Sequence, residues 1–125
     1  MSGYSDVKAV TITADTVALD ADGISVATSV GNNAALVIGG ALASGGAVAL
    51  SHGRIVTILS AGNDSTKSFT VVGTDVNGDA QTESITGANA DTATGTKYFL
   101  TIASITAVGN PAGNVSAGVN ASAAD

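Results

Sequence analysis

The stretch that decides the fold is Lys67–Thr86, which reads KSFTVVGTDVNGDAQTESIT. Its centre, Asn77-Gly78, favours a tight reversal because both residue types tolerate the positive φ that such a turn requires. Before the turn, Phe69, Val71 and Gly73 share one face of an extended chain, and the residues between them point the other way. The stretch therefore predicts a β-hairpin with strands over residues 67–74 and 80–86.

The second strand of this hairpin has two unlike faces. The side chains alternate so that one face carries Gln81, Glu83 and Ile85. The opposite face carries only hydroxyl side chains, those of Thr82, Ser84 and Thr86. Hydroxyl groups both donate and accept hydrogen bonds, so this face is expected to contact solvent or a partner.

Short β-branched runs between Gly, Asn and Asp clusters continue on both sides of the hairpin, and no long window has the apolar spacing of an amphipathic helix. The pattern predicts an all-β domain, an antiparallel β-sandwich or a barrel-like sheet. Residues 98–108 are expected to form a long central strand with Tyr98, Leu100 and Ile102 on its apolar face. The predicted strands are residues 7–13, 24–29, 34–38, 47–50, 54–60, 67–74, 80–86, 98–108 and 114–119.

A chain of 125 residues is expected to form a single domain, residues 1–125. With no Trp, two Phe, two Tyr and 16 Gly, its core must consist mainly of Val, Ile, Leu and Ala, so neighbouring subunits are expected to add stability. Residues 1–50 are richer in Ala and Gly and are expected to include an arm and a loop, the latter at residues 41–46, for subunit contacts. Residues 120–125 are expected to be a flexible tail unless a partner holds them.

The charge balance disfavours several classes of partner. Ten acidic and four basic residues give a formal net charge of −6. The cations Lys8, Arg54, Lys67 and Lys97 are scattered, so direct binding to nucleic acid or to an anionic membrane is not expected. The absence of cysteine excludes disulfides and thiol chemistry. Residues 1–6 lack the basic and apolar regions of a signal peptide, so a secretory leader is not expected.

Candidate catalytic residues are few. His52 is the only histidine, and as a base it would act on Ser51 or another hydroxyl with a carboxylate to orient it. No acid lies nearby in sequence, so a turn or strand-end histidine is the preferred interpretation. Glu83 is the sole glutamate, which argues against paired-carboxylate glycoside hydrolysis. Arg54 is interpreted either as an intersubunit anchor for a carboxylate or as an ordinary surface residue.

Candidate metal or phosphate sites are equally incomplete. Asp75, Asn77 and Asp79 have the spacing of the first ligands of a calcium loop, but Ala80 and Thr86 stand where that loop needs Gly and Glu. Turn chemistry is therefore the preferred interpretation. The acidic cluster of Asp15, Asp20 and Asp22 is expected to be solvated, and the pairs Gly39-Gly40 and Gly45-Gly46 lack the Lys and Ser/Thr of a phosphate loop. No catalytic, cofactor-binding or metal-binding residue is predicted, and the chain is not expected to be an enzyme.

The second half of the chain, from about Ile58 to Val119, resembles a family of short virion proteins from tailed bacteriophages. The segments that carry this resemblance are Ser60–Asp64, Phe69–Asp75, Asn77-Gly78, Gln81–Gly87, Ala93–Phe99 and Ile105-Thr106. The resemblance implies a structural protein of the virion, with capsid decoration (cement) as the first option. It further implies binding to the major capsid protein and to other copies of itself, as a homotrimer, after assembly in the host cytoplasm. It carries over no catalytic residues.

Two other functions remain open from the sequence. The same β domain could be an assembly module of a tail, neck or fibre. It could also be a carbohydrate-binding or adhesin domain, assisted by calcium at Asp75, Asn77 and Asp79.

Overall fold

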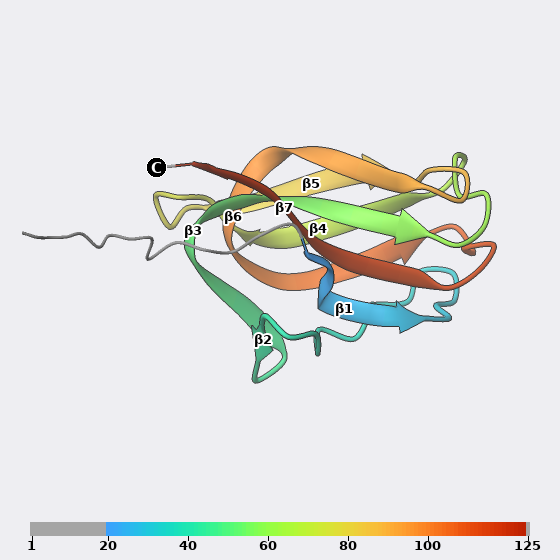
Figure 1. Ribbon diagram of the computed structural model, residues 1–125, viewed down its shortest axis with the longest axis horizontal. Helices are drawn as coiled ribbons and strands as arrows, with labels where there is room; N and C mark the ends of the chain where they lie inside the picture. Colours follow the sequence, from blue (N-terminus) through green and yellow to red (C-terminus); the bar gives the residue numbers. More distant parts are fainter. Residues whose placement is uncertain (1–19, 125) are drawn as a thin grey trace, which may run out of the picture.

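The computed structural model describes the backbone of residues 20–124 and the side chains of residues 20–120. The described part is all-β, as the sequence predicted, and its strands are antiparallel (Figure 1). The strands are β1 (Asp20–Thr28), β2 (Ala43–Ser44), β3 (Ala47–Ser60), β4 (Ser68–Thr74), β5 (Ala80–Thr86), β6 (Thr92–Val108) and β7 (Val115–Ala124).

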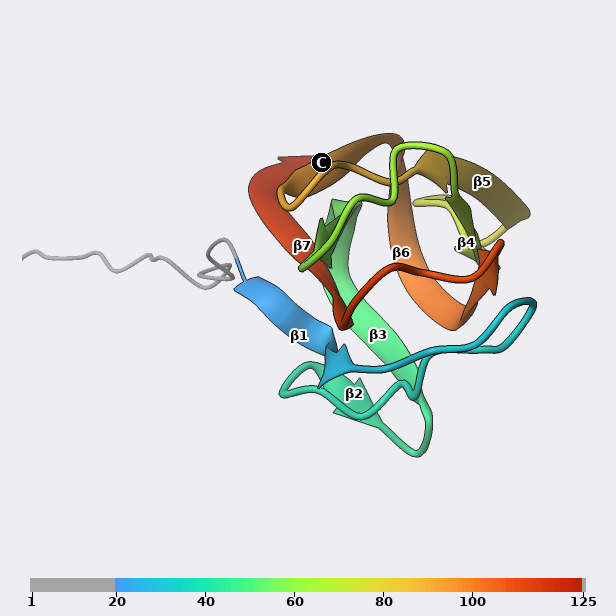
Figure 2. The ribbon, with the colours of Figure 1, turned by 90° about the vertical axis from the view of Figure 1, so that its right-hand side faces the viewer.

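The strands form one open sheet in the order β1-β7-β3-β6-β4-β5, with the short β2 paired to β3. The edge strands of this order are β1 and β5. Figure 2 shows the sheet strongly curled, with β1 and β5 at opposite margins of the molecule. This curl lets one face of a single sheet enclose the core.

The core consists mainly of β-branched residues, because the chain has few aromatic residues to bury. Phe69 and Phe99 are fully buried, and Ile and Val side chains from the other strands surround them. The fully or nearly fully buried aliphatic residues include Ile24, Val48, Val56, Ile58, Val71, Ile102, Ile105, Val115 and Val119. Every long strand thus contributes to one core.

The predicted hairpin is confirmed, and its register runs without a break from Ser68 opposite Thr86 to Thr74 opposite Ala80. The turn differs in detail from the prediction. Gly78 has a φ of 85°, whereas Asn77 keeps a negative φ. The N–H of Gly78 donates to the carbonyl of Asp75 (3.0 Å), and the N–H of Asp75 donates to the carbonyl of Asp79 (2.9 Å). The connection is therefore a three-residue loop in which only the glycine takes a left-handed conformation.

The prediction for β6 was right about its central position and wrong about its faces. β6 lies between β3 and β4, and its buried residues include Phe99, Ile102 and Ile105. The register to β4 shifts between Val72 opposite Ser104 and Gly73 opposite Ile102. The extra residue on β6 changes which side chains point inward between Ile102 and Ile105. Phe99 and Ile102 are also both buried although they are three residues apart, so simple alternation from Tyr98 onward fails.

Other predicted elements differ in extent. Residues 47–50 and 54–60 belong to one strand, β3, whose register to β6 shifts between Ala49 and Arg54. Within residues 34–38 the only strand-like feature is an isolated bridge from Ala35 to Thr106. Residues 41–46, predicted as a loop, contain β2, and Gly45-Gly46 connects it to β3 with both φ values positive.

The two ends of the chain were predicted as a strand and a tail. The strand predicted at residues 7–13 lies outside the described residues. Residues 120–124 were expected to form a tail, but the structure places them in β7, where Arg54 pairs with Ala123 and Gly53 with Ala124. Pairing with the long β3 makes this segment part of the sheet.

Candidate interaction surface

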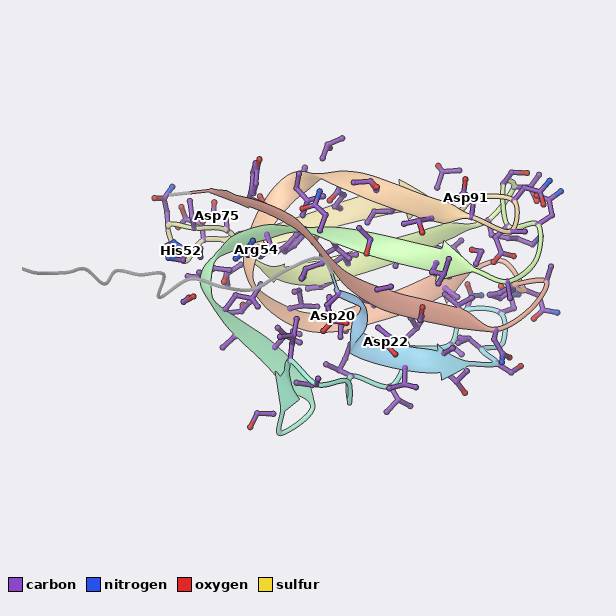
Figure 3. The ribbon with its side chains drawn as sticks, in the orientation of Figure 1. Asp20, Asp22, His52, Arg54, Asp75 and Asp91 are labelled. Carbon is purple, nitrogen blue, oxygen red and sulfur yellow. The ribbon has the colours of Figure 1, made fainter. Side chains whose placement is uncertain are left out.

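The single histidine lies in a distorted part of β3. His52 is half-buried and falls within the register shift between Ala49 and Arg54. Figure 3 shows His52, Arg54 and Asp75 at the same end of the molecule. Arg54 is 2% exposed, so the interpretation of this residue as an ordinary surface arginine was wrong.

The calcium-like spacing at the hairpin serves the turn itself. Oδ1 of Asp75 accepts hydrogen bonds from the N–H of Asn77 (2.8 Å) and from the N–H of Asp79 (3.0 Å). An Asp at the start of a turn commonly bonds the backbone ahead of it in this way. The carboxylate therefore organises the reversal, and the side chains of Asn77 and Asp79 are exposed.

The second acidic cluster is only partly described. Asp22 is exposed, and its N–H donates to Oδ1 of Asp20 at 3.3 Å, whereas Asp15 lies outside the described residues. Among residues 20–124, no group of three or more His, Asp or Glu side chains is placed to share a metal ion. The same residues include no helix with the length and hydropathy of a membrane span.

Glu83 has a structural position that the sequence analysis missed. The side chain is 8% exposed and points inward from β5, on the face it shares with Ile85. Its Oε2 accepts from the N–H (2.6 Å) and the hydroxyl (3.1 Å) of Thr96, and its Oε1 accepts from the N–H of Lys97 (3.4 Å). Gln81 donates from Nε2 to the carbonyl of Tyr98 (2.7 Å). Side chains of β5 thus bond the backbone of β6, although β4 lies between these two strands in the order of the sheet.

Asp64 plays a comparable part at the loops. It is fully buried, and its Oδ1 accepts from the N–H of Ala112 at 2.8 Å. Its backbone N–H donates to the carbonyl of Ala88 (2.9 Å), so three loops meet at this residue. No local sequence pattern indicates this contact, because the partners are far apart along the chain.

Part of the outer surface, on β5, β4 and β6, is a face without ionisable side chains. The register places Thr70 between Ser84 and Thr106, and parallel rows lie on either side of that row. We call this surface the hydroxyl face. Its members are Ser68, Thr70, Val72, Thr82, Ser84, Thr86, Ser104, Thr106 and Val108.

The hydroxyl face is accessible and uncharged. Each member is exposed or half-exposed, and Val72 and Val108 are 39% and 45% exposed. The chain has a net charge of −6, yet no member of this face is charged. The centre of a protein interface is typically depleted of charge, since desolvating a charge is costly. The sequence predicted the β5 part of this face, and the bulge in β6 concealed the contribution of Ser104, Thr106 and Val108.

Comparison of the chain with protein-family models, with curated proteins and with solved structures finds no match.

Proposed function

We propose that the protein is a structural component of a tailed-phage virion, a decoration (cement) protein that binds the head shell through its hydroxyl face. The class of protein comes from the resemblance of residues 58–119 to short virion proteins. The mode of action comes from one observation, the uncharged Ser, Thr and Val rows on three adjacent strands.

The adjacent rows of hydroxyl groups on three strands favour contact with a protein surface. Hydroxyl groups on neighbouring strands can bond backbone or side-chain groups of a partner without the cost of desolvating an ion. Val72 and Val108 add apolar area between the hydroxyl groups. A single contact of this kind is modest in strength. Repetition of the contact over a symmetric shell would make the total stabilisation large.

The charge of the remaining surface fits the same role. A net charge of −6 with only four cations disfavours binding to packaged DNA and keeps the free protein soluble before assembly. The shell partner in this proposal is the major capsid protein, and the decorating unit is a homotrimer.

The direct test compares particles assembled with and without the protein. Both are heated, and the release of DNA is followed with a fluorescent dye. We expect particles that lack the protein to release DNA at a lower temperature. Equal survival of the two kinds of particle would refute the cement function, and a few dozen copies per particle rather than hundreds would place the protein in the tail, neck or fibre.

A substitution tests the proposed face. Thr70→Lys puts a charge at the centre of the hydroxyl face. We expect the affinity for undecorated particles to fall at least about tenfold, because binding would bury an unpaired ammonium group. Thr94→Lys is the control, since Thr94 is an exposed threonine on the half of β6 that pairs with β3. Equal binding by the two variants would show that shell contact uses another surface.

A further inference from the structure

Two dipeptides in this chain favour attack of a backbone nitrogen on the preceding side chain, Asn77-Gly78 and Asp22-Gly23. In that reaction the nitrogen of the glycine bonds to the Cγ atom of the Asn or Asp before it. Glycine favours ring closure because it has no side chain to obstruct the attack and allows wide backbone rotation. No other Asn or Asp in the sequence is followed by Gly, so these two positions are the candidates.

The surroundings of Asn77-Gly78 are open. Both residues are exposed on the three-residue loop between β4 and β5, and a Cβ built on Gly78 would have no heavy atom within 4 Å apart from its chain neighbours. The N–H of Gly78 donates to the carbonyl of Asp75 at 3.0 Å. Exposed loop segments open locally at a small free-energy cost, so this nitrogen is released while the rest of the sheet stays folded.

The surroundings of Asp22-Gly23 are closed. Gly23 is buried in β1, and a Cβ built on it would lie 2.6 Å from Oδ2 of Asp20 and 2.8 Å from Cδ1 of Leu42. The carbonyl of Gly23 accepts from the N–H of Leu42 at 2.8 Å, so the loop beside β1 also holds the backbone here. The glycine nitrogen is therefore unable to turn toward Cγ of residue 22 unless β1 separates from this loop.

We propose that Asn77 is a site of spontaneous deamidation, which the hairpin turn exposes and Asp75 restrains. The nitrogen of Gly78 loses its proton to the solvent and forms a bond to Cγ of Asn77. The Cγ–Nδ2 bond breaks, the amide nitrogen leaves as ammonia, and a cyclic succinimide remains. Water then opens the ring at either carbonyl, and its oxygen stays in the new carboxylate. The products are an aspartate with the ordinary backbone and an isoaspartate, in which the backbone runs through Cγ.

Asp75 restrains the reaction because its hydrogen bonds hold the reacting peptide in the turn. Its carbonyl accepts from the Gly78 N–H that must lose a proton, so that bond has to break first. Its Oδ1 accepts from the N–H of Asn77 (2.8 Å) and from the N–H of Asp79 (3.0 Å), which stabilises the same conformation. Removing this carboxylate therefore raises the fraction of time for which the nitrogen of Gly78 is free to react.

The isoaspartyl product changes the hairpin more than the aspartyl product does. It inserts an extra atom into the backbone between the carbonyl of Asp75 and the N–H of Gly78, which bond each other in the present loop. Both products add a negative charge between Asp75 and Asp79, where like charges repel. We expect the isoaspartyl form to have a lower Tm than Asn77→Asp, which adds the same charge without lengthening the backbone.

Peptide mapping by mass spectrometry of the folded protein after incubation measures the rate at each Asn. We expect Asn77 to deamidate at least about tenfold faster than any other Asn of the chain. Asp22→Asn is the matched control, because it creates the same dipeptide in β1 by replacing an exposed side chain with one of equal size. The amide at position 22 should react at least about tenfold more slowly than Asn77 in the folded chain, and at a similar rate in urea, where packing no longer protects it.

Two variants test the turn, each checked for folding by circular dichroism. Asp75→Ala should raise the rate at Asn77 at least about threefold, because the turn opens more often. Asn77→Gln should abolish the modification at this position, since the longer side chain closes the ring far less readily. Survival of Asn77 for as long as the amide at position 22, or a rate that Asp75→Ala leaves unchanged, would overturn the proposal. Purified protein suffices for every measurement, so the result is independent of the shell-binding proposal.

Discussion

The carboxylate of Glu83 is expected to stabilise the curl of the sheet more than any other single polar side chain on β5. It is 8% exposed and accepts three hydrogen bonds from Thr96 and Lys97, two of them from backbone N–H groups of β6. A Cβ added to Gly95 would lie 2.7 Å from Oε1 of Glu83, so the backbone of β6 approaches this carboxylate closely. Replacing Glu83 by Ala would leave these donors without their acceptor.

The expected magnitude follows from the bonds that are lost. Hydrogen bonds to a charged group contribute about 1.5–3 kcal/mol, and an unsatisfied buried donor costs a similar amount. Water can reach part of this site, because Thr96 and Lys97 are themselves exposed. We therefore expect Glu83→Ala to lower the free energy of unfolding by about 3 kcal/mol, which corresponds to a fall in Tm of roughly 10 °C for a domain of this size.

Urea and thermal unfolding followed by far-UV circular dichroism measure this effect. Glu83→Gln keeps the size of the side chain but turns one acceptor into a donor, so its loss should be about half that of Glu83→Ala. Ser84→Ala is the control, because Ser84 is the exposed neighbour on the opposite face of β5 and should change the free energy of unfolding by less than about 0.5 kcal/mol. The reasoning is refuted if Glu83→Ala and Ser84→Ala unfold at the same urea concentration.

Two further predictions concern backbone positions. Gly73→Ala should prevent or severely impair folding, since its Cβ would collide with the carbonyl of Thr101 on β6. Gly31→Ala adds a Cβ with no atom near it and should leave Tm unchanged or slightly raised. Similar Tm values for the two variants would contradict the observed pairing of β4 with β6. Asp75→Ala should cost about 1 kcal/mol through loss of its two bonds to the turn, and calcium should leave the Tm of the wild type unchanged. A rise in Tm on addition of calcium would instead support the adhesin alternative.

Local alternation of side chains was sufficient to predict most of the sheet. The hairpin of β4 and β5 was predicted to within one residue, because both its faces and its turn are encoded within consecutive residues. The burial of Phe69 and Val71 follows from the same alternation. Where a strand has regular pleating, the sequence alone determines which side chains point inward.

The prediction failed where the regular pleat is interrupted. The extra residue in β6 near Ala103 changed which side chains point inward. Two segments predicted as separate strands are one strand, β3, and a register shift around His52 lies between them. A bulge depends on how two strands are paired, so one strand read by itself does not reveal it. The same limit concealed the three β6 residues of the hydroxyl face.

The sequence by itself determined that this chain forms an all-β domain with a hydroxyl-rich hairpin, because strand period and turn chemistry are local properties. Tertiary structure alone decided that Glu83 bonds β6, that Asp64 joins three loops, and that Val26 and Val37 flank one groove. These arrangements bring together residues distant along the chain. These contacts stabilise the folded state only when the whole sheet has curled, and no local pattern of residues encodes that curl.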